Sequence, residues 1–136
     1  MPYKVLSHTA DTGIEARAGT LVDLIADLAT GMFALMAEAD PRSAKHEIEI
    51  EVGGPTPEDL VVEVLSDLLY QSEVEDLLLC DFDVGPVGER RMRVKARGVP
   101  LSDVEIAGPP IKAVTYHDIK VTEIAGDWYG RVYFDV

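Results

Sequence analysis

The chain has 136 residues, of which 47% are apolar, and its 12 Lys and Arg face 25 Asp and Glu, a formal net charge of −13. This length suits one buried core, so we expect a single domain over residues 1–136. The acidic excess opposes binding to a phosphate backbone, so we expect no direct nucleic acid binding; it suits a cation or a basic protein partner, or serves solubility alone.

Two helices are predicted among strands. The first follows Thr20 as N-cap and ends before the segment ADPRS, where Pro41 disfavours helical geometry in the residue before it. The second has Thr56 as N-cap and Pro57 as its first helical residue. Apolar residues spaced by three and four give each helix one buried face: Leu21, Leu24, Ile25, Leu28, Met32 and Met36 in the first, and Leu60, Val61, Val64, Leu65, Leu68 and Leu69 in the second.

The remaining segments read as strands. HEIEIEV at residues 46–52 and RRMRVKAR at residues 90–97 both alternate between apolar and charged residues, as half-solvated strands do. The second carries a basic row, Arg91, Arg93, Lys95 and Arg97, which is either a solvated face or a partner-docking site. Short connections and hairpin signals favour antiparallel pairing, so the predicted fold class is α+β, with two helices packed on mainly antiparallel β-sheet and the N- and C-terminal strands as neighbours.

The C-terminal segment ends in an alternating strand. In IKAVTYHDIKVTEI, residues 111–124, the alternation slips at His117 and Asp118, which indicates either a β-bulge or the end of strand pairing. A hairpin is predicted at AGD, residues 125–127. In RVYFDV, residues 131–136, the alternation places Phe134 in the core and Asp135 on the opposite face.

Membrane and secretory features are not expected. The longest apolar runs, such as LLLC at residues 77–80, are far shorter than the roughly 18 residues that a membrane span requires. No basic and apolar leader precedes MPYKVLSHTA, and a single Cys80 allows no intramolecular disulfide. A cytoplasmic protein without membrane association is therefore expected.

Several motifs together resemble the archease family. They are HTADTGIEA at residues 8–16, GMF at residues 31–33, KAVTYHDIKV at residues 112–121, and the tryptophan followed by RVYFDV at the C-terminus. Two positions depart from the family pattern: Thr12 and Val64 stand where a bulkier apolar residue and an aromatic residue are expected. The resemblance implies a non-catalytic accessory protein that activates the tRNA-splicing RNA 3′-phosphate ligase, by promoting guanylylation of its catalytic histidine and multiple turnover.

The resemblance also implies a metal site formed by Asp11, Asp135 and the terminal carboxylate of Val136. Three neighbouring carboxylates repel one another unless a cation lies among them. Hard oxygen ligands suit calcium, which we expect, and also magnesium or manganese. Read without the resemblance, Asp11 in Asp-Thr-Gly is better explained as a turn former than as a metal ligand.

Four further residues are partner-contact candidates: His8, His117, Lys112 and Thr115. His8 lies three residues before Asp11, and His117 lies where the strand alternation slips, so both imidazoles could face a partner. The alternative for each histidine is a ring that is merely hydrogen-bonded in place.

Two other classes of function stay open. One is a metal-dependent phosphoesterase, in which His8 or His117 acts as general base beside the ion. The chain offers no nucleophile elbow, phosphate loop or basic pocket for it. The other is a chaperone or specificity factor for a different RNA-modifying enzyme, which the acidic surface permits.

Overall fold

A computed structural model describes residues 2–7 and 12–136 of the chain. The elements in chain order are β1 (Tyr3–Ser7), β2 (Thr12–Ala18), α1 (Leu21–Ala34), the 3₁₀ turn η1 (Pro41–Ser43), β3 (His46–Gly53), α2 (Pro57–Glu75), β4 (Leu77–Gly88), β5 (Arg91–Pro100), η2 (Leu101–Asp103), β6 (Ala113–Val114), β7 (Lys120–Ile124) and β8 (Asp127–Asp135).

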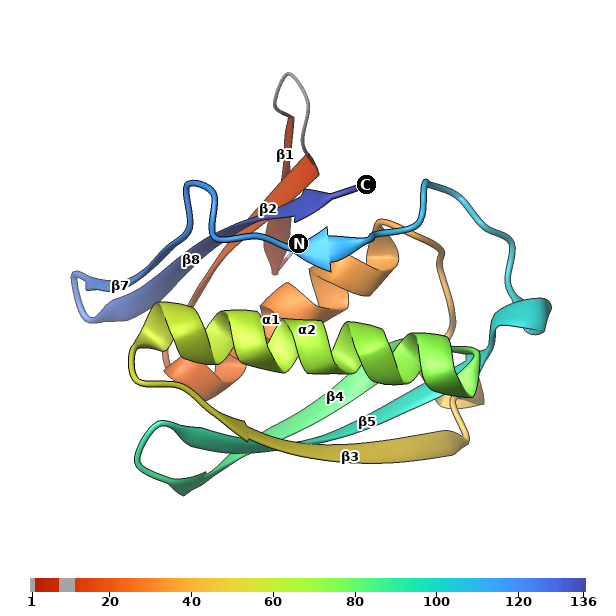
Figure 1. Cartoon of the computed structure of the whole chain (residues 1–136), viewed down its shortest axis with the longest axis horizontal. Coiled ribbons are helices and arrows are strands. Elements are labelled where there is room, and N and C mark those ends of the chain that lie inside the picture. The colour runs from red at the N-terminus through yellow and green to blue at the C-terminus, as the bar shows by residue number, and fades with distance from the viewer. Residues whose placement is uncertain (1, 8–11) are drawn as a thin grey trace.

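The strands form two antiparallel sheets (Figure 1). The larger has five strands: β1 pairs with β2, β2 with β8, and both β6 and β7 pair with the other edge of β8. The smaller has the order β3-β5-β4. The α+β prediction is confirmed. The prediction that the first and last strands are neighbours is wrong: β8 pairs with β2, whereas β1 lies at the sheet edge and pairs with β2.

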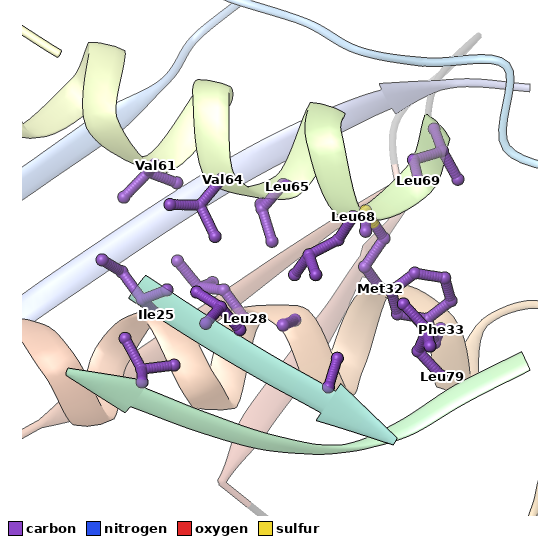
Figure 2. Close-up of a cluster of buried hydrophobic side chains, with 14 of the residues drawn as sticks. Ile25, Leu28, Met32, Phe33, Val61, Val64, Leu65, Leu68, Leu69 and Leu79 are labelled. Atoms are coloured by element: carbon purple, nitrogen blue, oxygen red, sulfur yellow. The ribbon is translucent and has the colours of Figure 1, made fainter. Parts of the chain in front are cut away.

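Both helices lie between the two sheets and close the core (Figure 2). Thr20 and Thr56 are the N-caps, as predicted: each hydroxyl accepts a hydrogen bond of 3.1 Å from the backbone N–H three residues later. The facing apolar stripes meet in the centre, contributed mainly by Ile25, Leu28, Met32 and Phe33 of α1 and Val61, Val64, Leu65 and Leu68 of α2.

The slip in the C-terminal alternation is a chain excursion. Val114 pairs with Phe134 and Lys120 pairs with Arg131, so the five residues 115–119 lie opposite only residues 132 and 133. Of the two predicted alternatives, a β-bulge or an end of strand pairing, the structure shows the second: the pairing with β8 stops after Val114 and resumes at Lys120. Asp118 takes a positive φ of 49° within this excursion, after which β7 rejoins the same edge of β8 in the same direction as β6.

The basic row of β5 is covered by carboxylates on both flanks. Each basic residue of the row except Arg91 has a cross-strand partner of opposite charge, Glu47, Glu49 and Glu51 on β3 and Asp81 and Asp83 on β4. Arg97 forms an ion pair with Asp81, while Arg93 lies 3.6 Å from Glu51. This face of the smaller sheet is therefore solvent-exposed and internally neutralised, which favours the first of the two interpretations of the row.

Neither α1 nor α2 is long and apolar enough to cross a membrane.

Candidate metal and partner-contact site

Asp135 and Val136 end the chain at the C-terminal end of β8, an interior strand of the larger sheet. Phe134 is fully buried, so the strand alternation turns the exposed Asp135 away from the core, as predicted. The backbone N–H of Lys112 donates to the carbonyl oxygen of Asp135 at 2.7 Å, and Ala113 is its cross-strand partner. The entry into β6 therefore fixes the backbone from which the Asp135 carboxylate projects.

The N-terminal half of the predicted site lies outside the described residues. This applies to Asp11, the predicted metal ligand, and to His8, a predicted partner contact. Thr12, the first described residue after them, lies opposite Phe134. Asp11 directly precedes Thr12 in the sequence, and Asp135 directly follows Phe134, the residue that pairs with Thr12.

Thr115 and His117 line the excursion beside the same strand. The backbone N–H and the hydroxyl of Thr115 both donate to the carbonyl oxygen of Tyr133, at 3.1 and 3.0 Å. The Thr115 hydroxyl accepts from the backbone N–H of His117 at 3.3 Å. The exposed imidazole of His117 has its Nε2 3.3 Å from a carboxylate oxygen of Asp118. Lys112, Thr115, His117 and Asp135 thus gather at one end of β8.

Tyr133 is a residue of this region that sequence reasoning missed. It lies on the outward face of β8 and yet is only 9% exposed. Its ring lies over Gly13, where an added Cβ would be 2.6 Å from a carbon of the Tyr133 ring. The centroid of the Tyr133 ring is 6.2 Å from the centroid of the His117 ring. A glycine inside a strand often marks such a close approach, so Gly13 was the feature of the sequence from which this contact could have been predicted. Tyr133 thereby sets the spacing between β2 and the excursion.

Tyr116 attaches the excursion to α2. Its hydroxyl donates to a carboxylate oxygen of Asp59 at 2.9 Å, while the ring is 54% exposed. This hydrogen bond, followed by desolvation and the negative charges of Asp59 and Glu63, raises the pKa of the Tyr116 phenol. The segment that carries His117 is therefore held from two sides, by β8 through Thr115 and by α2 through Tyr116.

The donors at the end of β8 are carboxylate oxygens, which hard divalent cations prefer. The described residues contain no group of three or more His, Cys, Asp and Glu side chains placed to hold a metal ion. Asp135 and Val136 could thus supply two of the three predicted donor groups, with Asp11 as the third. The donor chemistry fits calcium, magnesium or manganese.

Two helices between antiparallel sheets, with an exposed acidic strand end, define a small acidic α+β domain. The model of the archease protein family (MTH1598/TM1083) matches residues 3–136. The chain therefore belongs to the archease family, as the sequence motifs predicted.

Relatives of full length support this assignment. The protein archease of Methanopyrus kandleri is 31% identical over 140 residues, with all of both chains covered. That of Pyrococcus furiosus is 34% identical, over 95% of this chain and 94% of the relative. Two solved structures share the fold: the solution structure of Methanobacterium thermoautotrophicum protein 1598, with a TM-score of 0.79, 23% identity and 99% of both chains covered, and the crystal structure of an archease from Thermotoga maritima, with a TM-score of 0.69, 20% identity and 98% and 96% covered.

Proposed function

We propose that this protein is a non-catalytic, metal-binding activator of the tRNA-splicing RNA 3′-phosphate ligase and acts in the cytoplasm. Family membership supports the class of function. The observation that carries the site is the pairing of Thr12 with Phe134, because it brings the strand that follows Asp11 alongside the strand that ends at Asp135. Asp11 and Asp135 are far apart in sequence, but each is the sequence neighbour of one member of the Thr12–Phe134 pair.

Asp11, Asp135 and the terminal carboxylate of Val136 would hold the ion. Calcium is the expected ion, with magnesium or manganese as alternatives. A bound divalent cation would neutralise the mutual repulsion of these carboxylates and present a positive charge at an otherwise acidic surface.

The flanking residues have distinct parts in this proposal. His117 and Lys112 are exposed beside the strand end and contact the ligase. Thr115 is half-buried and its hydroxyl is engaged with Tyr133 and His117, so it positions the excursion. His8 is the fourth contact candidate. The ligase then receives an activator whose contact residues are held by β8 and α2.

The test is a multiple-turnover RNA ligation assay with the ligase and GTP, in which this protein is added or withheld. We expect more ligated product per ligase molecule when it is present, and more guanylylated ligase at early times. Unchanged turnover across a range of ratios would contradict the proposal. Hydrolysis of phosphate esters by the purified protein alone would support the phosphoesterase alternative instead.

A further inference from the structure

The outer face of α2 carries exposed apolar residues near its C-terminal end. Tyr70 and Val74 lie one turn apart and are 61% and 57% exposed. The opposite face of the helix packs in the core through residues such as Leu65 and Leu68. Tyr70 and Val74 are thus large apolar side chains left uncovered on a helix whose other face is already buried, where a partner could cover them.

The same end of α2 has an unfavourable charge distribution. The C-terminus of a helix carries a partial negative charge and favours Lys or Arg in the last turn. Here the last turn contains Glu73 and Glu75, Asp76 follows as the C-cap, and no basic residue is present. Among the described residues, the two glutamate carboxylates have no hydrogen-bond or ion-pair partner. A cation from outside the chain would relieve this repulsion.

A hollow lies beside two of these carboxylates, those of Glu75 and Asp76. Its volume is about 590 Å³, and its lining includes Glu75 and Asp76 of α2, His46 and Glu47 of β3, and Ser102 of η2. The hollow can accept a long side chain, and the Glu75 and Asp76 carboxylates in its lining favour a cationic one, because α2 has no Lys or Arg to neutralise them. Val74 of the exposed apolar pair is followed directly in sequence by Glu75, which lines the hollow.

The carboxylates of the smaller sheet do not compete for such a partner. Those on β3 and β4 flank the basic row of β5, with ion pairs such as Arg97–Asp81. α2, by contrast, has six acidic residues and no Lys or Arg. Charge complementarity therefore points to the C-terminal end of α2.

We propose that this surface, which we call the α2 docking surface and define as Tyr70, Glu73, Val74, Glu75 and Asp76 with the adjoining hollow, binds an amphipathic segment of the ligase that carries Lys or Arg. The inference rests on the proposed function, because an enzyme that holds RNA must present clustered Lys and Arg. The apolar side of the segment covers Tyr70 and Val74, and a basic side chain enters the hollow.

This contact is separate from the proposed metal site. Figure 1 shows the C-terminal end of α2 beside the start of β3, whereas β8 ends above the helix next to β6. Two separated contacts with one partner convert the second into an intramolecular event and lengthen the life of the complex.

The test measures the Kd for the ligase by calorimetry at two salt concentrations. In the double variant Glu73→Lys/Glu75→Lys we expect binding weakened by about tenfold or more at low salt, with a smaller salt dependence. The melting temperature of this variant should be unchanged or higher, because positively charged side chains near the C-terminus of a helix stabilise it. The matched control Glu89→Lys/Glu123→Lys makes the same charge change on exposed residues of the β4–β5 turn and of β7. Its Kd for the ligase should be closer to that of the parent than the Kd of Glu73→Lys/Glu75→Lys is. Tyr70→Ser/Val74→Ser tests the apolar half and should also weaken binding.

The outcomes separate the two proposals. Parent-like binding by a folded Glu73→Lys/Glu75→Lys protein, or equal weakening in the control, would overturn the α2 docking surface while ligase activation stands. If the parent protein does not bind the ligase at all, both proposals fail. Weaker binding in the two α2 variants together with retained fold supports the surface.

Discussion

At the scale of single residues, Asp135 is an exposed acidic side chain without a stabilising partner among the described residues. Carboxylates that repel one another in the absence of an ion do not contribute to stability. We therefore expect Asp11→Ala and Asp135→Ala each to abolish ion binding in calorimetry and ligase activation in the ligation assay, while circular dichroism and melting temperature stay close to those of the parent. Parent-like activation by both variants would show that the site is incidental.

Tyr129 gives a prediction for alkaline pH. Burial, together with a hydrogen bond from its hydroxyl to Glu15, raises its pKa to about 12. An unfolded tyrosine ionises near pH 10, so only the unfolded state loses this proton between about pH 10 and pH 12. The stabilisation is complete below about pH 10 and is lost as the pH rises towards 12.

Tyrosinate absorbance and stability measurements check this directly. One late step near pH 12 should disappear from the spectroscopic titration of folded Tyr129→Phe. The free energy of unfolding of the variant should also fall less steeply than that of the parent above about pH 10. A titration with the late step still present would assign it to another tyrosine.

At the scale of elements, the contact of Tyr133 with Gly13 holds β2 and β8 in register at the site. A Cβ at position 13 would lie 2.6 Å from the Tyr133 ring and 2.9 Å from the carbonyl oxygen of Val132, which is backbone and cannot move aside. We expect Gly13→Ala to lower the free energy of unfolding by about 1–3 kcal/mol in urea denaturation. Gly19→Ala, where no atom lies within 4 Å, is the control and should stay within about 0.5 kcal/mol. Equal stability of the two variants would contradict the close contact.

The elements that sequence could predict are those in which a local pattern decides the structure. Thr20 and Thr56 began their helices as predicted, because capping depends only on residues a few positions away. The interruption of pairing at residues 115–119 was one of two predicted alternatives, but its length was not predicted, because that length depends on where β8 offers an edge for β7 to rejoin. Burial of Tyr133 was missed for the same reason: the groups that cover it come from distant segments.

At the scale of the whole molecule, the core between two sheets could be predicted only in part. The apolar faces of both helices were readable from spacing, but their enclosure by two separate sheets was not. Strand order depends on pairings between distant segments, such as β2 with β8, which alternation within one strand does not encode. Of the candidate site, the outward direction of Asp135 was predicted correctly, while metal binding stays a prediction.

The predicted role of the Val136 carboxylate is tested by moving the chain end. Residues appended after Val136 replace a charged carboxylate by a neutral peptide carbonyl, which should weaken a calcium-type site because affinity follows ligand charge. We expect the C-terminal extension to lower ion affinity and ligase turnover, and the same extension before Met1 to change neither appreciably. If both proteins behave alike in calorimetry and ligation, the terminal carboxylate has no such role.

The central claim is that an ion-binding strand end lets this protein activate the ligase. The most direct measurement is the number of ligations per ligase molecule in the presence of GTP with parent protein, Asp135→Asn, which removes one charge at nearly constant shape, or Glu123→Gln, which removes one exposed charge from β7. We expect many turnovers with the parent and Glu123→Gln and a loss of the stimulation with Asp135→Asn. Full stimulation by Asp135→Asn would contradict it.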